Sequence, residues 1–134
     1  MKWFKDIQNR QIRLTYERQE HIEADHPEMF RQIDKIQATL SNPDMIVRSK
    51  IDQDVELFYR HYSITPVTEK YLCAVVKVLV GDLFIITAYF TDTVIRGEIL
   101  WERKYDFGMI KREITLMSFL SEKLGTLRKQ KTMQ

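Results

Sequence analysis

The sequence predicts an α+β domain in which two N-terminal helices pack on a curled antiparallel sheet of about four to five strands, with a C-terminal amphipathic helix. Three observations lead to this prediction. Apolar residues recur at helical spacing before residue 42, alternate over residues 45–101, and return to helical spacing after Gly108. At 134 residues the chain is long enough for one core and too short for two. We expect one domain over residues 1–101 and a basic helical extension over residues 102–134.

The N-terminal part has the pattern of a short edge strand followed by two helices. The strand is expected over residues 9–14 and leads into Thr15, whose hydroxyl suits the cap of a helix over residues 16–25. Pro27 disfavours helical geometry in the residue before it. The first helix should therefore end there, and a second should begin at the proline and run to about Leu40.

The middle of the chain alternates between apolar and polar residues, as strands of a half-exposed sheet do. The two strongest strands are rich in β-branched and aromatic residues and should form the centre of the sheet. The expected strands are residues 45–51, 55–62, 70–79 and 83–92, with a short edge strand at 98–101.

The loop between the two central strands decides which polar side chains share a face. A two-residue turn at residues 81–82 would place Lys77 opposite to Thr87 and Tyr89. A three-residue loop at residues 80–82 would place all three on one face. We favour the longer loop because three-residue hairpin loops usually contain a glycine. It also places the polar residues on the same face of the sheet.

Composition narrows the class of protein. The single cysteine, Cys73, excludes an internal disulfide and is expected to pack in the core. The N-terminus lacks the apolar run of a secretory signal. No stretch is apolar enough to span a membrane, so we expect a cytoplasmic protein without a membrane partner. Four glycines form no phosphate-binding loop, so no nucleotide cofactor is expected.

Charge is placed unevenly along the chain. The net charge is +2, but residues 102–134 carry eight Lys or Arg against four acids, which leaves residues 1–101 slightly acidic. The basic amphipathic segment is expected to pack on its own domain or to form a homodimer. Bulk positive charge therefore does not define what the main domain binds.

The segment HIEADHP, residues 21–27, holds two of the three histidines of the chain. They are suited to proton transfer, to half of a metal site, or to a solvated helix end. His21 and His26 would project about 140° apart on one continuous helix, although the break at Pro27 relaxes this. A zinc site with Glu23 or Asp25 lacks the usual ligand spacing, so no metal is expected.

Four segments in this order carry a family resemblance: HIEADHPEM, ELFYRHY, KYLCAVVKVL and FIITAYFTD. Together they resemble the phage- and mobile-element-linked branch of the barnase, EndoU, colicin and RelE nuclease superfamily, over roughly residues 12–101. The resemblance implies a small α+β domain that cleaves RNA without a metal, through attack of the ribose 2′-hydroxyl on its own phosphate. It assigns proton transfer to His21 and His26, phosphate binding to Arg60, phosphate orientation to Thr87, and substrate-binding support to Lys77, Tyr89 and Tyr62.

Two functions of different class follow. The first is a small toxin-type ribonuclease that acts on RNA and is held in check by an inhibitory partner protein. The second is a catalytically inactive or regulatory binding module on the same fold, such as a homodimeric protein-interaction domain, which the acidic balance of residues 1–101 favours. Structural roles compete with the catalytic ones: Arg60 could pair with Glu56, the Lys77 stem could reach solvent, and His61 is expected to be structural.

Overall fold

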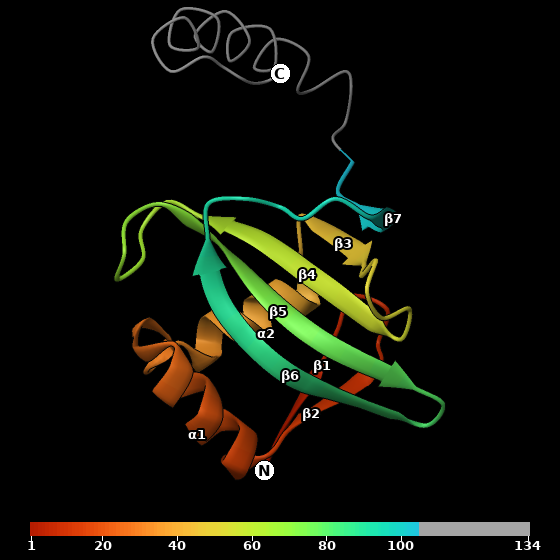
Figure 1. Ribbon diagram of the computed structural model, residues 1–134, viewed down its shortest axis with the longest axis horizontal. Coiled ribbons are helices and arrows are strands. Elements are labelled where there is room, and N and C mark those ends of the chain that lie inside the picture. Colours follow the sequence, from red (N-terminus) through yellow and green to blue (C-terminus); the bar gives the residue numbers. More distant parts are fainter. Residues whose placement is uncertain (105–134) are drawn as a thin grey trace, which may run out of the picture. The chain divides into compact units, whose positions relative to one another are not determined.

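The computed structural model describes residues 1–104; the expected C-terminal helix, and dimerisation through it, lie outside these residues. The compact unit runs from Met1 to Arg103. Figure 1 shows its sheet, whose strand order is β1-β2-β6-β5-β4-β3-β7. In chain order the elements are β1 (Lys2–Lys5), β2 (Gln11–Leu14), α1 (Tyr16–Asp25), the 3-10 turn η1 (Pro27–Met29), α2 (Ile33–Ser41), β3 (Met45–Arg48), β4 (Val55–Tyr62), β5 (Lys70–Leu79), β6 (Asp82–Thr91) and β7 (Glu98–Glu102).

The predicted antiparallel sheet of four to five strands was wrong, because the sheet has seven strands and is mixed. Lys2–Lys5 forms a strand that pairs antiparallel with β2. β2 in turn joins β6 in parallel, with Ile12 opposite Leu83. Four residues are too few to show a period in the sequence, and the long connection that parallel pairing needs is supplied here by everything between β2 and β6.

Helix α1 begins and ends where predicted. The Thr15 hydroxyl accepts a hydrogen bond from the Arg18 amide at 3.1 Å, which satisfies one free donor of the first turn. The single second helix from Pro27 to Leu40 was wrong. Pro27 starts only a 3-10 turn, after which Arg31 takes a positive φ of 63°, and regular α geometry begins at Ile33. A residue with that φ cannot continue a right-handed helix.

The hairpin between β5 and β6 combines features of both alternatives. Its loop has two residues, Val80 and Gly81, and the positive φ of 76° at Gly81 favours glycine there. The predicted three-residue loop was therefore wrong. A β-bulge near Val75 then shifts the pairing by one residue. Beyond the bulge the register is the one predicted for the three-residue loop, with Val75 opposite Thr87 and Cys73 opposite Tyr89.

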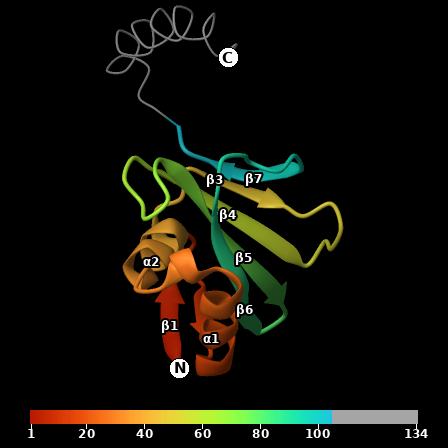
Figure 2. The same ribbon diagram turned by 60° about the vertical axis from the view of Figure 1, so that its left-hand side comes forward.

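The sheet has two different faces. Both helices of the described part of the chain pack on one of them, as Figures 1 and 2 show, and we call it the helix face. We call the opposite one the open face. The core of the helix face is Phe4, Ile12, Leu14, Ile22, Met29, Ile36, Leu40, Ile46, Phe58, Leu72, Ala74, Val76, Ile85 and Ala88. The smaller cluster of the open face is Val47, Val55, Leu57, Tyr59 and Cys73.

The segment that leads from β6 to β7 crosses part of the open face. Val94 packs against the open-face cluster, and the Ile95 amide donates to the Tyr59 hydroxyl at 3.1 Å. Gly97 then passes directly over the Arg48 carbonyl and the Val47 side chain, where a Cβ atom would collide with both. This close passage lets β7 pair with β3 and complete the sheet edge.

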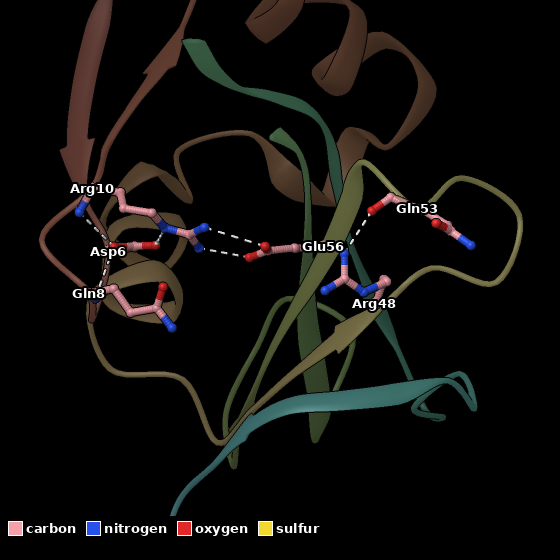
Figure 3. A network of polar contacts seen from close by, with 6 residues as sticks. All are labelled: Asp6, Gln8, Arg10, Arg48, Gln53 and Glu56. Carbon is pink, nitrogen blue, oxygen red and sulfur yellow. Dashed lines mark hydrogen bonds and ion pairs between the residues drawn. The ribbon is translucent and has the colours of Figure 1, made fainter. Parts of the chain in front are cut away.

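A buried ionic network holds the β1–β2 turn against β4 (Figure 3). Asp6 accepts hydrogen bonds from the amides of Gln8 and Arg10 at 2.9 and 2.8 Å. The Arg10 guanidinium bonds Asp6 at 2.7 Å through Nε and Glu56 at 2.7 Å through Nη2. Glu56 therefore pairs with Arg10, and the expected pair of Glu56 with Arg60 is not formed.

Among the helices described, none combines the length and the apolar character that crossing a bilayer requires.

Candidate functional site

His26 and Tyr89 meet at the outer edge of β6. β2 covers this edge only as far as Phe84, so the rest of it faces the junction between α1 and η1. His26 ends α1, where its amide bonds the Ile22 carbonyl at 2.7 Å, and the following Pro27 keeps it out of helical geometry. Its ring lies edge-on to Tyr89, with 5.5 Å between the ring centroids. The helical layer thus delivers an imidazole to a side chain of the open face.

Tyr89 also belongs to a buried group of hydroxyls and a thiol. Tyr59 and Tyr89 each bring their hydroxyl group next to the Cys73 thiol. Burial raises the pKa of the Cys73 thiol to about 11, and burial raises the pKa of both tyrosines far above the usual value. The cysteine is therefore an unreactive thiol at neutral pH, and the tyrosines keep their protons.

Thr87 and Lys77 share the open face with Tyr89, as predicted from the favoured register. Thr87 lies opposite Val75 and is half-buried. Lys77 lies further along the sheet and forms an ion pair with Asp52, with 2.5 Å between Nζ and Oδ2. This hydrogen bond raises the pKa of Lys77 and lowers the pKa of Asp52. Lys77 thus reaches solvent near a carboxylate rather than the Tyr89 hydroxyl.

Arg60 and Tyr62 lie on the helix face, because Phe58 and Tyr62 of the same strand pack in its core. Arg60 Nη1 donates to the Asn42 carbonyl at 2.6 Å, and its guanidinium stacks on the Tyr62 ring at 5.6 Å. Asn42 ends α2, so Arg60 places a positive charge at the negative end of the helix dipole. The Tyr62 hydroxyl bonds Thr39 at 3.1 Å.

Arg60 is therefore committed to holding α2 on the sheet. The four residues that the family resemblance assigns to catalysis do not share one site. Arg60 and Thr87 lie on opposite faces of the sheet. His21 is exposed on α1 and makes no hydrogen bond or ion pair within residues 1–104, whereas His26 reaches the open face. The structure groups His26, Tyr89 and Thr87.

His61 is a residue that sequence reasoning set aside as structural. It lies on the open face beside Tyr71, with ring centroids 5.3 Å apart, and Tyr71 in turn lies edge-on to Tyr59. His61 Nε2 is 2.8 Å from a Glu69 carboxylate oxygen. Strand alternation, which puts His61 on the face opposite to Arg60, was the signal that could have grouped it with Thr87 and Tyr89.

The resulting arrangement offers proton transfer and hydrogen bonding. His26 is half-exposed, so its imidazole can exchange protons with solvent, and it borders a face that presents hydroxyl groups. Within residues 1–104, no cluster of three or more His, Cys, Asp or Glu could hold a metal ion. The contact of the His26 imidazole with Tyr89, beside the Thr87 hydroxyl, is suited to acid–base chemistry with hydrogen-bond donors.

Compared with known proteins, the chain matches no family model, no curated protein and no solved structure.

Proposed function

We propose that the chain is a small metal-independent endoribonuclease whose centre is the β6 edge, with His26, Thr87 and Tyr89 as its active groups. The observation that carries the proposal is the contact between the His26 ring and Tyr89, which brings a titratable imidazole to a hydroxyl-lined face. The motif resemblance supports RNA as the substrate, because it runs through the segments that hold these three residues.

His26 acts as the general base of this reaction. Its imidazole takes the proton of a ribose 2′-hydroxyl, and the 2′-oxygen attacks the adjacent phosphorus. The bond between phosphorus and the 5′-oxygen breaks, the leaving oxygen takes a proton from solvent, and a 2′,3′-cyclic phosphate and a 5′-hydroxyl result. Tyr89 stays protonated because burial raises its pKa, and its single hydroxyl proton would turn from the Cys73 thiol to donate to the phosphate beside Thr87.

We place this activity in the cytoplasm, where RNA is accessible and a buried free thiol meets no oxidising environment. An enzyme that cleaves RNA there would need an inhibitory partner protein. Expression of the full chain without such a partner should arrest growth, and His26→Ala should relieve the arrest.

The direct test is cleavage of a labelled oligoribonucleotide by the purified full chain in the presence of EDTA. We expect products that end in a 2′,3′-cyclic phosphate, and a rate at least about 100-fold lower for His26→Ala, as loss of a general base costs. His21→Ala is the matched control, because His21 is the exposed histidine five residues earlier on the same helix. Equal rates for wild type and His26→Ala would refute the proposal.

A non-catalytic RNA-binding module is the second candidate, and the position of Arg60 favours it. The reacting phosphate gains negative charge in the transition state, and a nearby cation stabilises that charge most. Arg60 instead holds the end of α2, while Lys77 is paired with Asp52. Saturable binding of an oligoribonucleotide without any cleavage product, for both wild type and His26→Ala, would establish this candidate in place of the ribonuclease.

A further inference from the structure

Four side chains form a row across the open face, at the end of the sheet where β1 and β2 join it. In the strand register Trp3 lies opposite Arg13, Arg13 opposite Phe84, and Phe84 opposite Lys77. The row therefore alternates an aromatic ring and a cation over four neighbouring strands. All four point away from the helices because their chain neighbours Phe4, Ile12, Ile85 and Val76 belong to the helix-face core.

Arg13 is held in the row by Phe84 and Asp82. Its guanidinium carbon lies 4.9 Å from the centroid of the Phe84 ring. Asp82 holds it from the side with two hydrogen bonds, both 2.9 Å, to Nε and Nη2. Arg13 Nη1 has no partner within residues 1–104, so this donor is available to a ligand. Lys77 likewise uses one of its three donors on Asp52.

Trp3 is the most exposed member, with 56% of its surface accessible. An indole is a large apolar surface to leave in water, and the fold does not need it there, because Phe4 anchors β1 in the core. Flat aromatic side chains on the open face of an antiparallel sheet are the platform on which single-stranded nucleic acids stack their bases. Cations between the rings suit the phosphates that link those bases.

We propose that this row, Trp3, Arg13, Phe84 and Lys77, is a binding subsite for single-stranded RNA, in which the rings stack on bases and the cations bind phosphates. The inference rests on the proposed function and extends it, because it names the form of the substrate and the path it takes. Both sites lie along β6. Phe84 and Tyr89 are five residues apart, or about 16 Å along a strand, a few nucleotides of an RNA chain.

Charge decides which force dominates at this subsite. Asp82 and Asp52 partly neutralise Arg13 and Lys77, so only about two phosphate contacts are on offer. For a single strand the logarithm of affinity falls with the logarithm of salt concentration at about −0.7 per contact, which predicts a shallow slope of about −1.4. Stacking must supply most of the affinity. Removing an aromatic ring from the row should therefore weaken RNA binding more than raising the salt concentration does.

The test is a fluorescence anisotropy titration of the full chain with a labelled 2′-O-methyl oligouridine, which the proposed chemistry cannot cleave. We expect Trp3→Ala to weaken binding about ten-fold, within the range that alanine substitution gives at a base-stacking aromatic, and Trp3→Phe to restore most of it. Arg13→Ala should weaken binding and make the salt slope shallower. The matched controls are Tyr16→Ala and Arg18→Ala, an exposed aromatic and an exposed arginine on α1, and both should bind as wild type does.

The outcomes separate the two proposals. Trp3-dependent binding without cleavage of ordinary RNA keeps the subsite and refutes the ribonuclease. Cleavage that depends on His26 while Trp3→Ala binds as wild type does refutes the subsite and keeps the ribonuclease. Equal affinity for Trp3→Ala and Tyr16→Ala, no saturable binding, or tighter binding of double-stranded than of single-stranded RNA also overturns the subsite. Tighter binding of an oligodeoxyuridine of the same length would assign the row to single-stranded DNA and overturn it as an RNA subsite.

Discussion

The helix face and the open face of the same sheet use their polar residues in different ways. On the helix face Arg60 bonds the Asn42 carbonyl, and Arg10 bonds two carboxylates through all three of its guanidinium nitrogens. On the open face Arg13 keeps a free donor, and His26 stays half-exposed beside Tyr89. Arginine therefore uses all its donor nitrogens within the fold at Arg10 and keeps one for a ligand at Arg13.

This difference separates stability from function in the molecule. The helix face holds the larger core and receives both helices, so changes there should mainly unfold the protein. The open face holds a small cluster, and its exposed residues should tolerate substitution while RNA cleavage or binding changes. Substitutions on the helix face should therefore lower the free energy of unfolding more than substitutions on the open face do.

Phe58→Ala should be the most damaging change, because Phe58 is fully buried on the helix face. We expect its free energy of unfolding to fall by about 3–5 kcal/mol, as truncation of a core phenylalanine does. Thr87→Ala, on the open face, should lower the free energy of unfolding by less than about 1 kcal/mol. Urea unfolding followed by circular dichroism compares them; similar losses would contradict the division between faces.

Arg10→Met should lower the free energy of unfolding by about 2–3 kcal/mol, because it leaves Asp6 and Glu56 buried without their cation. Arg13→Met removes an arginine of similar pairing from the open face. There the partner Asp82 is half-exposed, so the loss should be below about 1 kcal/mol. Thermal unfolding of the two variants side by side checks this, and an equal loss would mean that the open-face pair is structural too.

Alkaline pH should destabilise the open-face cluster. The folded pKa of Cys73 is raised from 9.0 to about 11, so the folded state binds more protons than the unfolded one in this window. Stability is then fully present below about pH 9 and falls as pH rises, by about 2 kcal/mol at pH 11 for this thiol. Tyr59 and Tyr89 lower stability in the same direction from about pH 10 upward, because 10.0 is their ordinary pKa and burial raises it in the folded state. Urea midpoints from pH 8 to pH 11 measure the slope, which Cys73→Ala should reduce.

Arg60→Ala should cost about 1 kcal/mol of stability and leave RNA cleavage and RNA binding unchanged at temperatures where the variant is folded. The reason is that its guanidinium bonds the end of α2 on the helix face. The check combines a melting curve with the oligoribonucleotide assays. A large loss of cleavage in a fully folded Arg60→Ala protein would return Arg60 to the active centre.

Local signals predicted most individual elements. Alternation gave β4 and β5 at their observed bounds, and Thr15 and Pro27 marked the two ends of α1, because these patterns act within a few residues. The sequence could not show that residues 2–5 pair with β2, because four residues are too few to show a period. It could not show that β2 joins β6 in parallel, because that pairing joins residues about 70 positions apart.

The candidate site was predictable in part for the same reason. The alternation of β6 placed Thr87 and Tyr89 on one face, and the HIEADHP break released His26 from α1. The separation of Arg60 from them needs only the alternation of β4 together with the knowledge of which face the helices cover. That second fact is tertiary. The row from Trp3 to Lys77 is tertiary as well, because it exists only once β1 and β2 lie beside β6.

The central claim is that the open face is where this protein meets RNA, and one measurement addresses it directly. Amide and side-chain NMR signals of the full chain are followed while a 2′-O-methyl oligouridine is added. We expect saturable shifts at Trp3, Arg13, Thr87 and Tyr89 and at the His26 ring, whereas the signals of Arg60 and Tyr62 should not move. Shifts centred on Arg60 and Tyr62, or none on the open face at saturating RNA, would contradict it.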